Sequence, residues 1–158
     1  MRVILSCFLF IIIGLKSDED MKLFARVVEN LSTTDIVVLN KLIDEVRISD
    51  TSISRACHGT LLMKKADFVK RPSEKLSLFK EGRKLLETEI KKDSANVNFR
   101  ILRLIIQENC PVFLKYNTNL DDDAVFVQRN FDKLSNKIRD LLITYSKNSK
   151  HLKLKESE

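Results

Sequence analysis

Two arginines and a glutamine stand in a segment that is otherwise mostly apolar. Arg100, Arg103 and Gln107 occur within the sequence FRILRLIIQENCP, where Phe, Ile and Leu fill most of the remaining positions. Residues at i, i+3 and i+7 share one face of a helix, so these side chains would form a single polar stripe. A guanidinium group binds a carboxylate or phosphate through two parallel hydrogen bonds. The stripe, together with Glu87, is therefore the candidate binding site for a ligand or partner.

Two structural interpretations compete with a binding site. The stripe can be the solvated edge of its helix, or the arginines can pair with carboxylates of neighbouring helices. The candidate carboxylates are Glu87 and the three aspartates at 121–123. A buried charge has to be paired, and charges in helical bundles are commonly structural. We therefore expect Arg100 and Arg103 to act mainly as ties between helices.

The other reactive side chains show no arrangement typical of an enzyme. The chain has two histidines, and no Cys and His spacing matches a zinc site. Cys57 and His58 are adjacent, so a helix would point them in different directions and separate a nucleophile from its base. We predict no catalytic residue, no metal and no cofactor. Enzymatic activity stays open but is the less favoured class.

Cys57 and Cys110 have two possible states. They are the two cysteines left once the first 17 residues are set aside. An even number of cysteines in an exported chain is consistent with a disulfide bond. Both cysteines also have apolar neighbours, where a free thiol behaves as a small hydrophobic group. The sequence leaves both states open.

The N-terminus has the pattern of a secretory signal. Arg2 precedes the apolar run Val3–Leu15, which is too short to span a bilayer comfortably but fits a signal peptide. We predict a signal peptide over residues 1–17 and export to the periplasm or the extracellular space. The alternative is an uncleaved anchor. Without Arg2 and Lys16, the 28 basic residues fall to 26 against 22 acidic ones, interleaved along the chain, so we expect no nucleic-acid partner.

The composition favours helices throughout residues 18–146. Three glycines and two prolines are too few for a sheet with many hairpins. Apolar spacing predicts an all-α, antiparallel bundle of about six helices. Pro72 either ends the third helix or opens the fourth, Ser73 and Asn96 can cap the fourth and fifth, and Gly82 allows a second backbone to approach closely. The expected helices cover residues 17–31, 36–47, about 50–69, 74–92, 97–110 and 121–145.

The last of these helices is expected to be long and continuous. Its aspartates at 121–123 supply a cap and an acidic first turn. Its apolar residues repeat at alternating spacings of three and four, which predicts one helix packed on the bundle of a monomer in preference to a dimeric coiled coil. The residues after it, 147–158, are predicted to form a basic, disordered tail. The apolar seam consists of Ala124, Val127, Phe131, Leu134, Ile138, Leu141 and Tyr145.

Part of the chain resembles known helical proteins. Gly82 and Leu86 fit two positions in the second helix of a tetratricopeptide unit, whereas Glu89 and Ser94 depart from that pattern. Residues 56–145 resemble a family of small, exported, uncharacterised helical proteins from Bacteroidetes. That family usually has proline at the position of Ser94 and lysine at that of His58. The resemblance implies export and a tetratricopeptide-like bundle, and it implies no activity. It is carried by Phe79, Gly82, Leu86, Glu87, Ile90, Asp93 and Asn96, and by Arg100, Leu102, Arg103, Gln107, Asn109, Pro111, Phe113, Leu114 and Tyr116.

These observations predict an interaction module. We expect an exported helical protein of the cell envelope that binds a protein or peptide in a groove of its bundle, with no stable membrane span after signal removal. The alternative is a small-ligand-binding protein or an enzyme that uses an arginine-lined groove formed by Arg100, Arg103, Gln107 and Glu87.

Overall fold

A computed structural model describes residues 18–154. The predicted signal peptide, residues 1–17, lies outside the described residues, as do residues 155–158. The described chain is an all-α bundle without a strand, as predicted. Its helices are an N-terminal helix over 18–30, α2 (Ile36–Ile48), α3 (Ser52–Lys65), α4 (Pro72–Lys92), α5 (Val97–Glu108), α6 (Leu120–Asn130) and α7 (Asn136–Ser146), with short 3₁₀ helices η1 (Ala66–Phe68), η2 (Val112–Leu114) and η3 (Phe131–Lys133).

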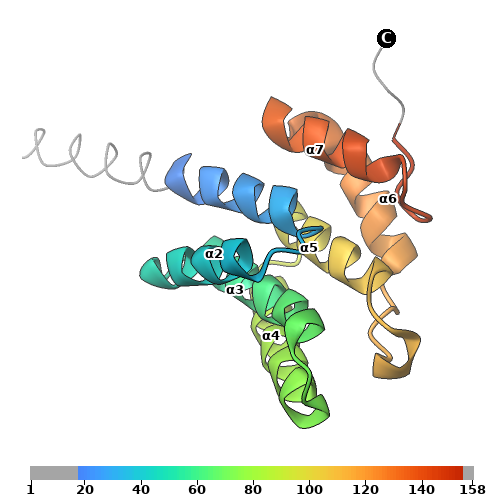
Figure 1. The fold of residues 1–158 in the computed structure, drawn as a ribbon. Coiled ribbons are helices and arrows are strands. Elements are labelled where there is room, and N and C mark those ends of the chain that lie inside the picture. Colours follow the sequence, from blue (N-terminus) through green and yellow to red (C-terminus); the bar gives the residue numbers. More distant parts are fainter. Residues whose placement is uncertain (1–17, 155–158) are drawn as a thin grey trace, which may run out of the picture.

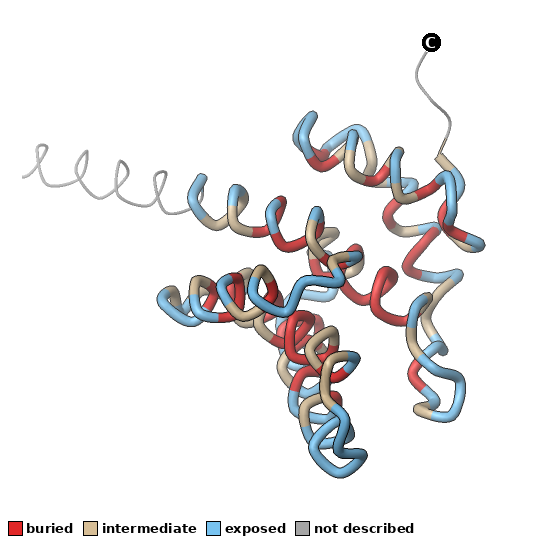
Figure 2. Tube along the Cα trace, viewed as in Figure 1, coloured by how far each residue is buried: buried red, intermediate tan, exposed pale blue. Residues whose placement is uncertain are grey.

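Helix α5 forms the centre of the molecule. In Figure 1, α2, α3 and α4 lie on one side of it, and α6 and α7 lie on the other. Figure 2 shows α5 coloured as buried along most of its length. It contacts α3, α4 and α6. A helix that is apolar nearly all round is expected to be enclosed in this way. Its buried residues are Phe99, Ile101, Leu102, Arg103, Leu104, Ile105, Ile106 and Gln107.

Helices α3 and α4 pack against each other at two glycines. A Cβ atom added to Gly59 would lie 2.5 Å from the carbonyl oxygen of Gly82, and one added to Gly82 would meet the carbonyl oxygen of Gly59. Neither position has room for a side chain, because the nearest atom in each case is a backbone carbonyl oxygen of the other helix. The close approach expected at Gly82 is therefore confirmed. The structure adds that Gly59 is its partner.

The ends of the helices agree with the sequence in part. Asn96 caps α5 as predicted, and its side chain accepts a hydrogen bond from the backbone of Asn98 (3.1 Å). Ser73 does not cap α4, because α4 begins at Pro72 with Arg71 in the capping position. Proline suits the first helical position, since its fixed φ angle matches the helix and its missing N–H is not needed there.

The prediction of one long C-terminal helix is wrong. The chain leaves α6 through η3, becomes extended at Leu134 and starts α7 at Asn136. Figure 1 shows α6 and α7 running in different directions. The segment NFDKLSN between them is rich in Asn, Asp and Ser, whose side chains compete with the helical backbone for hydrogen bonds. The acidic first turn of α6 is confirmed, but its N-cap residue is Asn119 and not an aspartate.

The prediction of a disordered tail is also wrong for residues 147–154. Leu152 is 0% exposed and Ser149 is buried. The Ser149 hydroxyl donates a hydrogen bond to Glu108 of α5 (2.7 Å), and Gln128 of α6 donates to the carbonyl oxygen of Lys153 (2.8 Å). Leucine among the lysines supplies the apolar contact that fixes this segment. Within residues 18–154, no helix has the length and apolar character needed to cross a membrane.

Candidate functional site

Arg103 lies at the centre of a buried charge cluster between three helices. Its Nε and Nη2 atoms donate to the two carboxylate oxygens of Asp123 in α6 (2.6 and 2.8 Å). Its Nη1 atom donates to Glu87 in α4 (3.2 Å). Arg103 is 4% exposed and Asp123 is 0% exposed. Burial alone would lower the pKa of Arg103, but the hydrogen bond and charge of Asp123, with the charge of Glu87, raise that pKa and keep the guanidinium charged.

Arg100 also binds the carboxylate of Asp123, from the edge of the cluster. Its Nη1 atom donates to Asp123 (3.0 Å), while Nε and Nη2 donate to the carbonyl oxygen of Ser94 (3.2 and 3.1 Å). The guanidinium carbon also lies 5.6 Å from the ring centre of Phe126. Arg100 therefore joins the loop before α5 to α6. The expected pairing of both arginines with carboxylates is confirmed.

Glu87 and Gln107 complete the predicted set. Glu87 accepts a hydrogen bond from the Tyr116 hydroxyl (2.6 Å). Burial raises the pKa of Tyr116, and the hydrogen bond and negative charge of Glu87 raise it further. Gln107 donates to the side chain of Asn119 (3.3 Å) and accepts from its backbone N–H (3.1 Å). Gln107 thus ties α5 to the start of α6.

The four predicted site residues therefore converge, with their polar groups directed at other parts of the chain. A ligand in contact with Arg103 would have to displace Asp123, which receives hydrogen bonds from two guanidinium groups. Breaking a buried pair of this kind is costly. Their role in binding stays a prediction, and the observed geometry is that of a structural tie. Among the described residues no group of histidines, cysteines and carboxylates is arranged to hold a metal ion.

The two cysteines of the described chain have different surroundings. Both are free and are not bonded to each other. Cys57 is buried in the core, where the apolar environment raises the pKa of its thiol. Cys110 is partly exposed at the wall of a groove. Burial raises its pKa too, although nearby Arg83 acts in the opposite direction.

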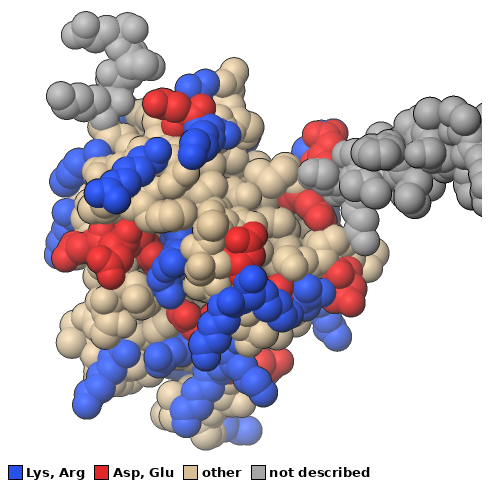
Figure 3. Space-filling model, turned by 180° about the vertical axis from the view of Figure 1, so that it is seen from behind, with Lys and Arg blue, Asp and Glu red and all other residues tan. Residues whose placement is uncertain are grey.

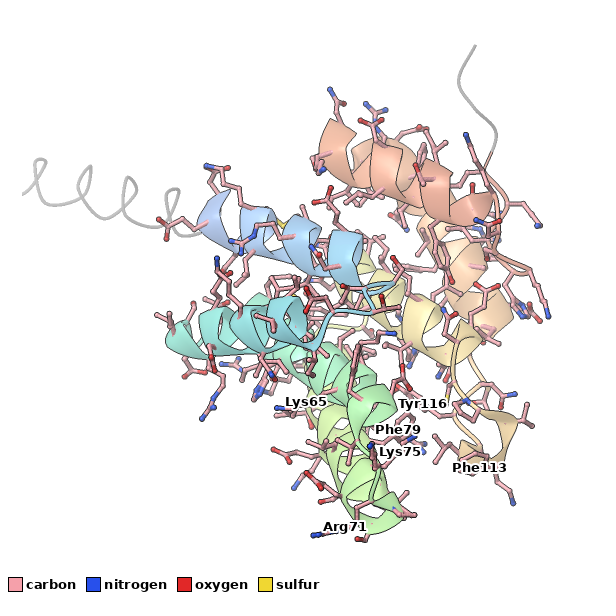
Figure 4. The ribbon with its side chains drawn as sticks, viewed as in Figure 1. Lys65, Arg71, Lys75, Phe79, Phe113 and Tyr116 are labelled. Atoms are coloured by element: carbon pink, nitrogen blue, oxygen red, sulfur yellow. The ribbon has the colours of Figure 1, made fainter. Side chains whose placement is uncertain are left out.

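An apolar groove of about 940 Å³, which none of the four predicted site residues lines, was missed by the sequence analysis. The groove is defined by the ends of the N-terminal helix, α3 and α5, the start of α4, η2 and α7. Phe113 stands at its edge and is 78% exposed. Figure 4 shows Lys75 and Phe79 on α4 opposite the loop that carries Phe113 and Tyr116. The one signal in the sequence is the apolar run after Pro111, which is not part of any amphipathic helix. The apolar side chains of the lining include Leu76, Phe79, Ile105, Ile106, Phe113 and Leu141.

A smaller hollow of about 420 Å³ lies farther along α4. It is bounded by basic side chains of α4 and by Tyr116 and Asn119. Phe79 of the groove meets Tyr116 of the hollow edge to face, with ring centres 5.8 Å apart. The Arg83 guanidinium lies over the Tyr116 ring, 4.5 Å from its centre. The groove and the hollow are therefore separated by a wall of two aromatic rings.

Comparison of the chain with family models, with curated proteins and with solved structures finds no match.

Proposed function

We propose that this protein is an exported interaction module of the cell envelope, which binds an apolar helical segment of another protein in the groove between α4, α5, η2 and α7. The observation that carries the proposal is the groove itself, with its apolar lining and the exposed Phe113 at its edge. Insertion of an amphipathic helix into an apolar groove is a common mode of peptide recognition.

The energetic reason is the exposure of Phe113 and its neighbours. Covering a large apolar side chain contributes about 1.5–3 kcal/mol, so a partner that covers several of them gains affinity from this surface alone. Phe113 follows Val112, which is also exposed, on a short 3₁₀ helix. Aromatic side chains at such positions are frequent anchors of protein interfaces.

Export is part of the proposal and has its own support. The apolar run at residues 3–15 and the switch to a polar sequence after it are typical of a secretory signal. The resemblance to exported Bacteroidetes proteins agrees with export. We also infer that α3 and α4 are a tetratricopeptide-like helix pair, which their contact at Gly59 and Gly82 supports. Mass spectrometry of the mature protein should find an N-terminus between Leu15 and Asp20, and an intact Met1 in a soluble cytoplasmic fraction would contradict export.

The groove is tested by site-specific photo-crosslinking. A photoreactive phenylalanine analogue at position 113, in cells that make the protein, should crosslink to one defined segment of a partner. The matched control carries the same analogue at Ile48 on α2, which is 87% exposed and does not line the groove. Both sites tolerate a bulky aromatic group because they face solvent.

A second pair of variants links the crosslink to the groove. Leu76→Glu places a charge in the groove lining and should abolish the crosslink at position 113. Val37→Glu, on the exposed surface of α2, should leave it unchanged. Equal crosslinking at positions 113 and 48, or a crosslink that survives Leu76→Glu, would refute the groove as the binding site.

A further inference from the structure

Helix α4 carries four basic residues on one exposed face. Lys80, Arg83, Lys84 and Lys91 follow spacings of three, one and seven residues, which place them side by side along the helix. We call this surface the cationic face of α4. All four residues line the smaller hollow. In Figure 3 lysine and arginine side chains gather over the lower part of the molecule, where α4 lies.

The cationic face differs from the opposite side of the same helix. There, Glu89 accepts hydrogen bonds from Arg55 (2.9 Å) and Lys92 (2.7 Å), so both of these cations are paired with a carboxylate. On the cationic face, none of the four cations forms an ion pair with any residue in the range 18–154. Glu87 is the one carboxylate that lines the hollow, and it is bound by Tyr116 and Arg103.

The cationic face continues directly from the apolar groove. Lys75, Phe79 and Arg83 occur at intervals of four residues, so one row of α4 side chains runs from the groove into the hollow. Phe79 and Tyr116 form the wall between the two spaces. A single extended ligand that crosses this wall would contact both surfaces.

We propose that the partner in the groove is acidic: an amphipathic helix places its apolar side chains in the groove and its carboxylates against Lys80, Arg83, Lys84 and Lys91. This inference rests on the proposed function and specifies the chemistry of the partner. Four unpaired cations lose no existing ion pair when they bind carboxylates. Complementary charge at the rim of an interface selects the partner and speeds its association.

The geometry sets the spacing of acidic residues in the partner. Leu76 in the groove and Lys84 in the hollow are eight residues apart, or about 12 Å along the helix axis at 1.5 Å per residue. A partner helix that runs along α4 would therefore carry its carboxylates about eight residues from its first apolar anchor. An anionic membrane suits this arrangement less well, because membrane-binding helices present both surfaces outward to a plane, whereas these cations line a hollow.

The test uses three peptides of about 18 residues, which is five helical turns. They share one leucine face and differ in a polar face of glutamate, glutamine or lysine. Fluorescence anisotropy measures their affinities for the purified protein at low salt and at about 0.5 M salt, where exposed charges are screened beyond a few ångströms. The glutamate peptide should bind tightest at low salt and lose this advantage at high salt.

Paired charge reversals identify the surface. Lys80→Glu with Lys84→Glu should weaken the glutamate peptide roughly tenfold at low salt and leave the glutamine peptide unchanged. Lys41→Glu with Arg47→Glu reverses the same charge on exposed positions of α2 and serves as the control. Circular dichroism establishes that both variants are folded.

The outcomes separate this inference from the proposed function. If the lysine and glutamate peptides bind equally, or if both double variants weaken the glutamate peptide equally, the acidic partner is refuted while binding in the groove stands. If no peptide binds in a manner sensitive to Leu76→Glu, the groove itself fails. If vesicles of phosphatidylglycerol bind through Lys80 and Lys84 and the glutamate peptide does not, the ligand is a membrane surface and the inference is overturned.

Discussion

The basic residues of α5 and those on the cationic face of α4 have the same charge and opposite surroundings. Arg103 is enclosed and makes hydrogen bonds to carboxylates of two other helices. Lys80 and Lys84 are exposed and have no carboxylate partner within the described chain. A buried ion pair stabilises the fold only while both members are present, because removing one member leaves the other charge uncompensated. The comparison indicates that α5 uses its cations to hold the bundle, whereas Lys80 and Lys84 of α4 take no part in holding the described residues together through ion pairs.

The largest effect is expected at the centre of the α5 cluster. Arg103→Ala should lower the free energy of unfolding by about 3–5 kcal/mol, because Asp123 then keeps a buried charge with one guanidinium in place of two. Chemical denaturation followed by circular dichroism measures the change. A loss below about 0.5 kcal/mol would place Arg103 on a solvated surface and remove the contrast with α4. If that stable variant also lost groove binding, the arginines would belong to the binding site.

Arg100 should have an intermediate effect. Arg100→Ala removes one charged hydrogen bond to Asp123 and two bonds to the carbonyl oxygen of Ser94, but Asp123 keeps its two-point contact with Arg103. The expected loss of stability is about 1–2 kcal/mol, measured by the same denaturation. Arg100→Lys restores the charge without the fork of donors and should recover only part of it. A loss as large as that of Arg103→Ala would show that Asp123 depends on both arginines equally.

The ion pairs of Glu89 on α4 should make the free energy of unfolding depend on pH. Burial would raise the pKa of Glu89, but hydrogen bonds from Arg55 and Lys92 outweigh it and hold this pKa below its ordinary value of 4.5. A carboxylate with a lowered folded-state pKa stabilises the fold above its unfolded-state pKa, and this contribution is lost as pH falls through the folded-state pKa. Glu89→Gln should therefore reduce stability near neutral pH. The difference in free energy of unfolding between this variant and the wild-type protein should shrink below pH 4.5.

The matched control for this pH dependence is Glu81→Gln. Glu81 is exposed on the same helix and forms no ion pair with a described residue. Its substitution removes no ion pair within the described chain and should change the free energy of unfolding by less than about 0.5 kcal/mol. If both variants changed the slope of the free energy of unfolding against pH equally, the ion pairs of Glu89 would not be the cause of the pH dependence.

The smallest effect on stability is expected on the cationic face. Lys84→Ala should change the free energy of unfolding by less than about 0.5 kcal/mol, because an exposed side chain without a partner loses no interaction. Thermal denaturation checks this value. A substantial loss of stability would show that the cations of α4 have structural partners, and the contrast with α5 would no longer hold.

The arginine cluster shows how much of the ion pairing could be predicted from the sequence. The apolar surroundings of Arg100 and Arg103 predicted that carboxylates of other helices would pair with them, and Glu87 and the aspartates at 121–123 were the expected partners. The structure has Glu87 paired with Arg103 and, of the three aspartates, selects Asp123 and leaves Asp121 and Asp122 exposed. This selection depends on how α6 is rotated against α5, which the spacing within either helix does not reveal.

The C-terminal helices show a different failure. Apolar residues from Ala124 to Tyr145 keep alternating spacings of three and four, and this pattern predicted one helix. Several of them are buried as expected, although the backbone is interrupted at Leu134. Periodicity reports which residues can face the core and is insensitive to a short break in the backbone. After the break the buried residues of α7 are Ile138, Leu142 and Ser146, and the expected Leu141 and Tyr145 are only partly buried. The Asn, Asp and Ser residues at 130–136 were the better signal.

The residues themselves were enough to predict the helical class, the cap at Asn96 and the close approach at Gly82, because these depend on residue types and on neighbours a few positions apart. Tertiary structure alone decided the rest. Asp123 meets Arg103, which lies 20 positions earlier in the chain, Gly59 meets Gly82, and Phe113 stays exposed beside a groove built from segments between residues 28 and 148. Ion pairing and cavities depend on distances between elements, and those distances are established only when the helices pack.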